Sequence, residues 1–185
     1  PRLRWGELSP HQVWHAVAGS PSDAGAFLRE LGWREFAWHT LFHAPDLATA
    51  NLRPEFDRFP WAPPGDDVVN AWRRGRTGFP LVDAGMRQLL ATGWMHNRVR
   101  MITASFLTKD LHVWWPLGAA HFLDHLIDGD LAANNGGWQW SASTGTDSVP
   151  YFRLFNPHSQ SRRFDPEGRF IRRYSIDELP QLFDV

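Results

Sequence analysis

Proline and glycine divide most of this chain into segments whose apolar residues recur at helical spacing. Ser9-Pro10 has the sequence of a helix N-cap followed by proline at the first helical position, and Gly19 would end that short helix. Apolar side chains then recur every three to four positions from about residue 22 to residue 44, where Pro45 stops the pattern. No segment shows the apolar–polar alternation of a strand. The sequence therefore predicts an all-α, multi-helical domain.

The same signals predict four more helices after a proline-rich loop over residues 45–66. These helices span 66–74, capped by Asp66 or Asp67, 80–92, ended by Gly93, 95–110, and 116–127. From Asp130 we expect a short capped segment that leads into an Asn-Asn-Gly-Gly turn. After Pro150 we expect irregular chain with turns at Asn156-Pro157 and at 165–168.

The overall charge does not mark a nucleic-acid-binding protein, because 19 basic residues stand against 20 acidic ones. Binding to nucleic acid would therefore need a local basic patch. Such a patch lies between residues 151 and 173, where six arginines accompany only Asp165 and Glu167. Charge alone is equally consistent with a solvated surface here.

The chain has no cysteine, which excludes disulfides and thiolate-bound metal or iron–sulfur sites. Its nine histidines show no metal-binding spacing, so we expect no metal site. No apolar run is long enough to cross a bilayer, and no signal peptide is present. We therefore expect a cytoplasmic protein without membrane contact.

The segment 128–140 concentrates chemistry that neither a core nor a plain loop would carry. It holds two carboxylates, two amides, two adjacent glycines and two indoles. Buried polar groups without partners are costly, and an ordinary surface loop has no need of two tryptophans. The combination suits a wall around a flat aromatic ligand with polar edges, because glycines admit close approach and indoles stack.

An arginine within an apolar helical segment is the second candidate site feature. Asn97, Arg100 and Met101 share one helical face by their spacing. If Arg100 is buried it needs a carboxylate, and Asp128 or Asp130 could supply one. The alternative is a surface ion pair that contributes little.

Two groups of residues that contain tryptophan could have either a functional or a purely structural role. Glu30, Trp33 and Arg34 share a helical face that could bind an unstacked base, or they could form an exposed, salt-bridged face. The indoles of Trp61, Trp115 and Trp138 could pass an electron, or each could simply pack in the core.

Four segments resemble, in order and spacing, the photolyase/cryptochrome family: 77–87, 93–101, 128–140 and 151–157. The third reads Asp-Gly-Asp-Leu-Ala-Ala-Asn-Asn-Gly-Gly-Trp-Gln-Trp. Within the family the chain is most similar to bacterial class I cyclobutane pyrimidine dimer photolyases. The resemblance implies a helical FAD-binding domain in which reduced FAD, excited by blue light, repairs a pyrimidine dimer flipped out of DNA.

The resemblance also implies roles for particular residues in binding FAD. Asn134 would face flavin N5, and Asp128 would pair with Arg100 beside the ring. The implied flavin contacts are Phe27, Arg100, Asp128, Gly129, Asp130 and Asn134. Phe27 stands where many members have tryptophan, so it would give only an apolar contact.

Further roles concern electron transfer and DNA. Trp138, Trp115 and Trp61 match the tryptophan chain that photoreduces oxidised FAD. Residues of the implied lesion pocket are Glu30, which would hydrogen-bond the base edges, Trp33, Asn97, Met101 and Trp140. Residues of the implied DNA-contacting surface are Arg34, Arg98, Ser159 and Gln160.

The resemblance runs from Leu3 to about Arg173 and covers the C-terminal part of the FAD-binding domain. The family's upstream phosphate-binding loop and its N-terminal α/β antenna domain, which would hold any antenna chromophore, are absent from this sequence. We expect a monomer that acts on DNA containing cyclobutane pyrimidine dimers, associated with the bacterial nucleoid during repair. Two alternatives stay open: a cryptochrome-type FAD photoreceptor without repair activity, and an inactive truncated fragment.

Overall fold

The structure, a computed structural model, describes residues 1–20, 24–63, 65–147 and 154–175. Within these ranges it is helical and contains no strand, which confirms the predicted all-α class. The α-helices are α1 (Pro10–Ala18), α2 (Gly25–His43), α3 (Asp66–Arg73), α4 (Pro80–Thr92), α5 (Asn97–Ser105), α6 (Trp115–His125), α7 (Leu131–Ala142), α8 (Pro157–Phe164) and α9 (Arg169–Ser175). Shorter turns are η1 (Pro45–Ala48), η2 (Pro54–Arg58) and the π-helical η3 (Phe106–Asp110).

Several helix ends follow local signals in the sequence. Ser9 caps α1 in a reciprocal capping box with Gln12. Gly93 ends α4 with a left-handed φ of 67°, which glycine adopts without steric cost. The predicted cap of α3 was wrong, because Gly65 occupies the N-cap and both aspartates lie in the first turn. There they still interact favourably with the helix dipole.

The expected turn at residues 134–137 was wrong, because α7 continues through both glycines. Each glycine costs roughly 1 kcal/mol of helix propensity, so other contacts must hold this helix together. Asp130 caps it, accepting from the Ala133 N–H at 2.8 Å. Further along, the buried amides of Asn135 and Gln139 bond the loop between residues 47 and 52.

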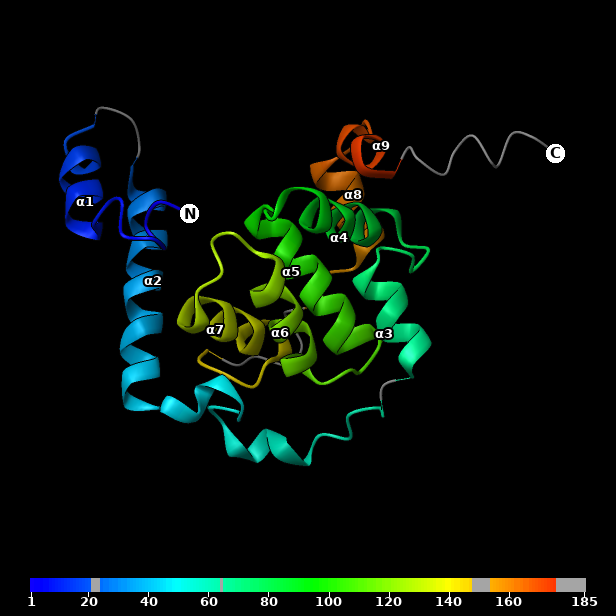
Figure 1. Cartoon of the computed structure of the whole chain (residues 1–185). Coiled ribbons are helices and arrows are strands. Elements are labelled where there is room, and N and C mark those ends of the chain that lie inside the picture. The colour runs from blue at the N-terminus through cyan, green and yellow to red at the C-terminus, as the bar shows by residue number, and fades with distance from the viewer. Residues whose placement is uncertain (21–23, 64, 148–153, 176–185) are drawn as a thin grey trace.

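The C-terminal region also differs from the expectation of irregular chain. Asn156 is not a turn residue but the N-cap of α8, accepting from the Ser159 N–H at 3.0 Å. The predicted turn at 165–168 separates α8 from α9, and Gly168 there has a positive φ of 64°. Figure 1 shows α8 and α9 lying beside α4, which anchors them. The loop over 45–66 contains η1 and η2, so it is partly helical as well.

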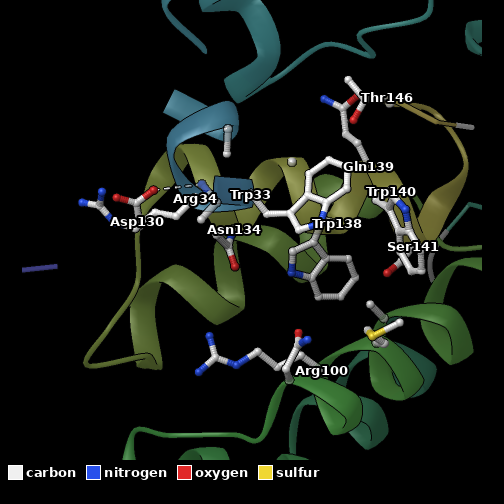
Figure 2. A pocket seen from close by; sticks show the side chains of 18 of the residues that line it. Trp33, Arg34, Arg100, Asp130, Asn134, Trp138, Gln139, Trp140, Ser141 and Thr146 are labelled. Carbon is white, nitrogen blue, oxygen red and sulfur yellow. Dashed lines mark hydrogen bonds between the residues drawn. The ribbon is translucent and has the colours of Figure 1, made fainter. Parts of the chain in front are cut away.

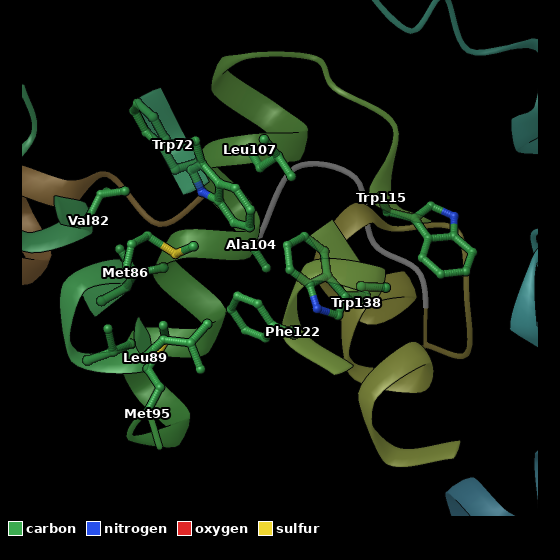
Figure 3. Packing of buried hydrophobic residues seen from close by; sticks show 14 of the residues in the cluster. Trp72, Val82, Met86, Leu89, Met95, Ala104, Leu107, Trp115, Phe122 and Trp138 are labelled. Carbon is green, nitrogen blue, oxygen red and sulfur yellow. The ribbon is translucent and has the colours of Figure 1, made fainter. Parts of the chain in front are cut away.

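The core lies among α3, α4, α5, α6 and α7 and is rich in aromatic residues (Figure 3). Trp72 stacks on Phe122 with ring centroids 6.1 Å apart, and Trp138 meets the edge of Phe122 at 4.9 Å. All three are almost fully buried, and each such side chain stabilises the fold by about 2–3 kcal/mol. This packing holds α7 in place, and α7 carries several of the predicted site residues.

Helices α1 and α2 stand at one side of this bundle, and α2 packs against α7 (Figure 1). Only Leu31 of α2 is buried. The segment before α1 is tied to the loop after α6, because the Trp5 indole donates to the Ile127 carbonyl at 2.8 Å and Arg4 donates to the Gly129 carbonyl at 2.5 Å. A cavity lies between α2 and the bundle.

Candidate functional site

A cavity of about 640 Å³ opens between α2, α5, α7 and the loop that joins α6 to α7 (Figure 2). Most of the residues predicted to contact flavin or DNA line it. These lining residues are Glu30, Trp33, Arg34, Asn97, Arg98, Arg100, Met101, Asp128, Gly129, Asp130, Asn134, Trp138 and Trp140. The remaining predicted residues, Phe27, Trp61, Trp115, Ser159 and Gln160, lie elsewhere.

Arg100 pairs with Asp128, which decides between its two candidate partners. One guanidinium nitrogen, Nη2, lies 3.1 and 3.0 Å from the two carboxylate oxygens of Asp128, while Nε donates to the Met95 carbonyl at 2.7 Å. Both side chains remain 20–27% exposed. The pair therefore places fixed, opposite charges at the wall of the cavity.

Asp130 is not a partner of Arg100, because its Oδ1 caps α7. It is 7% exposed and lines the cavity one turn before Asn134. The N-terminus of α7 thus brings a carboxylate and an amide to the same wall. Gly129, just before, has its carbonyl engaged by Arg4.

Asn134 and Asn135 form a chain of directed amide hydrogen bonds. Nδ2 of Asn134 donates to the Ala119 carbonyl at 3.0 Å and to Oδ1 of Asn135 at 3.1 Å. Nδ2 of Asn135 in turn donates to the Ala48 carbonyl at 2.9 Å. The resemblance had singled out Asn134 but missed Asn135, which is 2% exposed.

The three candidate electron carriers all belong to, or pack against, the hydrophobic core. Trp138 is 2% exposed and also lines the cavity. Trp115 is fully buried and donates its indole N–H to Oδ1 of Asn51 at 2.8 Å. Trp61 is partly buried against Phe59, with ring centroids 4.6 Å apart. Only the first of the three therefore touches the cavity.

The α2 wall presents an acid, an indole and an arginine, as their spacing predicts. Trp33 is 57% exposed and meets the edge of Phe36 with ring centroids 5.7 Å apart. Arg34 forms an ion pair with its neighbour Glu35, so this part of the face agrees with the structural alternative of an exposed, salt-bridged surface. Glu30 and Trp33 remain available at the cavity.

Arg98 sits where α5 meets α8. Its guanidinium lies 4.9 Å from the ring centroid of Phe164 and 5.8 Å from that of Phe155. Phe155 in turn stacks against Trp140 at 6.3 Å. These two phenylalanines were not predicted from the sequence. Phe155 thus links two side chains that line the cavity, Arg98 and Trp140.

Ser159 and Gln160 lie on α8, outside the cavity, with Oε1 of Gln160 buried and without a hydrogen-bond donor in the described part of the chain. Phe27 is 50% exposed on α2 and does not line the cavity. Arg153, the first arginine of the basic patch, lies outside the described residues. The other arginines of the patch lie on α8 and α9.

A helical domain with an aromatic and charged cavity of this kind is typical of cofactor-binding proteins. The family described as the FAD binding domain of DNA photolyase matches residues 27–184. The chain belongs to this family.

Relatives and solved structures agree with that family. Deoxyribodipyrimidine photo-lyase of Escherichia coli (strain K12) is 53% identical over 192 residues, which cover 99% of this chain and 39% of the relative. The crystal structure of a bacterial class III photolyase from Agrobacterium tumefaciens aligns with a TM-score of 0.88 at 48% identity, covering 94% of this chain and 37% of that one. The Synechocystis cryptochrome structure aligns with a TM-score of 0.87 at 36% identity, covering 96% and 38%.

The chain thus spans about two fifths of the length of the relatives it matches. Among the described residues, no helix combines the length and the apolar character needed to cross a membrane.

Proposed function

We propose that this chain belongs to a light-driven DNA repair enzyme whose cavity holds reduced FAD next to a cyclobutane pyrimidine dimer flipped out of the duplex. When bound, reduced FAD would supply, on absorbing blue light, the electron that lets the dimer split into two pyrimidines, and would take that electron back afterwards. One observation carries the proposal. Residues from α2, α5 and α7 and from the loop before α7, each matched to a flavin or lesion contact, meet around a single cavity.

The cavity suits a flat ligand with polar edges. Its volume of about 640 Å³ is within the range of roughly 300–1,000 Å³ usual for cofactor sites. The pair of Arg100 and Asp128 offers a donor and an acceptor at one side, and Asn134 and Asp130 offer further polar atoms. In this proposal Asn134 lies next to flavin N5 and Trp138 supplies electrons when the flavin is oxidised.

The lesion would enter between α2 and the end of α7. Trp33 and Trp140 would stack on the pyrimidines, Glu30 would hydrogen-bond their edges, and Asn97 and Met101 would line the floor. Flipping a damaged base costs a few kcal/mol, less than for an intact pair. Stacking on an aromatic ring is worth about 1–3 kcal/mol per base and offsets that cost.

The DNA backbone would contact the surface formed by Arg34, Arg98 and α8. Phosphate contacts position a protein on DNA without reading sequence, which suits a repair enzyme that must find dimers anywhere. Ser159, Gln160 and the arginines of α8 and α9 would contribute to this surface.

The test is light-driven splitting of a thymine dimer in an oligonucleotide by protein loaded with reduced FAD. We expect repaired oligonucleotide, separated by chromatography, to accumulate under blue light and not in the dark. The similarity to the Synechocystis cryptochrome makes a photoreceptor the second candidate. Protein that holds flavin and responds to light but leaves the dimer intact would favour that function. Protein that takes up no flavin would contradict both.

A further inference from the structure

Each asparagine of the Asn134–Asn135 pair can be assigned its side-chain orientation from its partners. A backbone carbonyl only accepts hydrogen bonds, so the Ala48 carbonyl, 2.9 Å away, must receive the Nδ2 of Asn135. The Oδ1 of Asn135 is therefore the atom turned to Asn134, which can meet it only with Nδ2, at 3.1 Å. The Ala119 carbonyl requires the same orientation of Asn134, with its Nδ2 3.0 Å away.

These bonds use both hydrogens of the Asn134 amide and leave its oxygen for a ligand. An amide nitrogen carries two hydrogens, and here both have buried acceptors. Oδ1 of Asn134 accepts no hydrogen bond in the described part of the chain, and the residue lines the cavity (Figure 2). The cavity therefore meets a hydrogen-bond acceptor at this position and not a donor.

We propose that Asn135 is a positioning residue that holds the Asn134 oxygen toward the cavity, so that the site favours a flavin carrying a hydrogen at N5. This inference rests on the proposed function, in which flavin N5 lies next to Asn134. Reduced flavin has an N5–H that donates to the oxygen, whereas oxidised flavin has a lone pair at N5 that the oxygen repels. Hydrogen bonds to ring nitrogens are among the means by which a protein tunes a flavin.

Asn135 is suited to this role because it cannot turn. It is 2% exposed, and flipping its amide would set its oxygen against the Ala48 carbonyl. Without Asn135, Asn134 would keep only the Ala119 carbonyl as a restraint and could turn its nitrogen toward N5. That orientation donates to oxidised flavin and removes the preference.

The first test is the midpoint potential of bound FAD in a double-mutant cycle. We expect Asn135→Leu, which keeps the volume but not the acceptor, to lower the ratio of reduced to oxidised flavin at a fixed potential about tenfold, or about 30 mV for a two-electron couple. In the Asn134→Ala background the same substitution should change the ratio less than twofold, because Asn135 acts through Asn134. Equal shifts in both backgrounds, or no shift in either, would overturn the proposal.

Gln139→Met is the matched control for loss of loop contacts. Gln139 lies one turn further along α7 and bonds the same loop, at Leu47, Ala50 and Leu52. It borders the cavity as a fully buried side chain but makes no hydrogen bond to Asn134. We expect this variant to lose stability as Asn135→Leu does while the flavin potential stays unchanged. A shift as large as that of Asn135→Leu would mean that the loop, and not the orientation of Asn134, sets the potential.

A second readout needs no flavin. Hydrogen exchange at the Asn134 side-chain amide, followed by nitrogen-15 NMR of the flavin-free protein, should be slow, because both hydrogens are bonded to buried acceptors. Exchange as fast as at a surface asparagine would overturn the orientation itself. Slow exchange in a protein that takes up no FAD would support the orientation while contradicting the proposed function, so the two failures are distinguishable.

Discussion

Trp138 belongs both to the cavity wall and to the aromatic core, which makes it the natural link between the two. Its ring contacts Phe122 and Trp72, and the residue also lines the cavity. We expect Trp138→Phe to block photoreduction of oxidised FAD, because phenylalanine is far harder to oxidise than tryptophan. Repair by protein whose flavin is chemically reduced should be spared. The rate of photoreduction is measured by the loss of flavin absorption, and an unchanged rate would contradict the electron-transfer role.

Gly118 sets the place of the Trp138 ring. A Cβ at this position would overlap that ring and lie 2.7 Å from Cδ2 of Leu107. Gly118→Ala should therefore destabilise the protein by about 1–3 kcal/mol through overpacking and slow photoreduction by displacing the indole. Urea denaturation and flavin absorption measure the two effects.

Gly32→Ala is the matched control for that substitution. Gly32 is also helical, but nothing lies within 4 Å of its added Cβ. Here the higher helix propensity of alanine should raise stability by roughly 0.5–1 kcal/mol. Equal destabilisation by the two substitutions would show that helix backbone effects, and not the Trp138 contact, are responsible.

Trp33 offers the most exposed ring at the cavity, so its effect on the fold should be small. We expect Trp33→Ala to weaken binding to dimer-containing DNA by about 1–3 kcal/mol, the contribution of one stacked base. Binding to undamaged DNA should change much less. Titrations of both DNAs at one salt concentration would test this, and equal loss on both would argue against a role in lesion recognition.

At the level of helices, local signals predicted some ends well and others not at all. The limits of α1 and α4 follow from Ser9 and Gly93, whose hydrogen bonds and φ angle are set within a few residues. Helix α7 runs through two glycines because Asn135 and Gln139 bond backbone groups about 90 residues earlier in the chain. No local pattern contains that information. The same holds for α9, which is anchored by packing on α4.

Helix α6 carries a buried histidine that should make stability depend on pH. Burial first, and then the nearby charge of His125, lower the pKa of His121 to about 4 from 6.5. Protonation of the His121 ring is therefore easier in the unfolded chain than in the folded one. As the pH falls from about 6.5 toward 4, the unfolded chain takes up this proton first, and the folded state loses stability relative to it. The slope should reach at most about 1.4 kcal/mol per pH unit.

His121→Phe isolates this effect. Phenylalanine cannot take up the proton, and Nε2 of His121 makes no hydrogen bond in the described part of the chain that would be lost. We expect the free energy of unfolding of the parent to fall more than that of the variant as the pH is lowered from 7 to 5. Burial raises the pKa of Asp110, which acts in the opposite direction, but that group is common to both proteins and cancels. A difference that does not vary with pH would contradict the assignment.

At the scale of the whole molecule, the cavity is formed by segments that lie far apart in the sequence. Most of the residues that the resemblance named as contacts of flavin or DNA line it, and the sequence alone narrowed the partner of Arg100 to two aspartates. The choice between them needed the structure, because Asp130 is engaged at the start of α7. The positions of Asn135, Phe155 and Phe164 were missed for the same reason: their partners are brought near only by folding.

An absorption spectrum of the purified protein is the first test of whether this cavity holds FAD. Flavin bands should be present in the parent protein and should bleach under blue light with a thiol donor. Arg100→Leu, which leaves Asp128 without its partner, should weaken those bands, whereas Gly32→Ala should retain them. A colourless parent protein that takes up no added FAD would show that the cavity is not a flavin site.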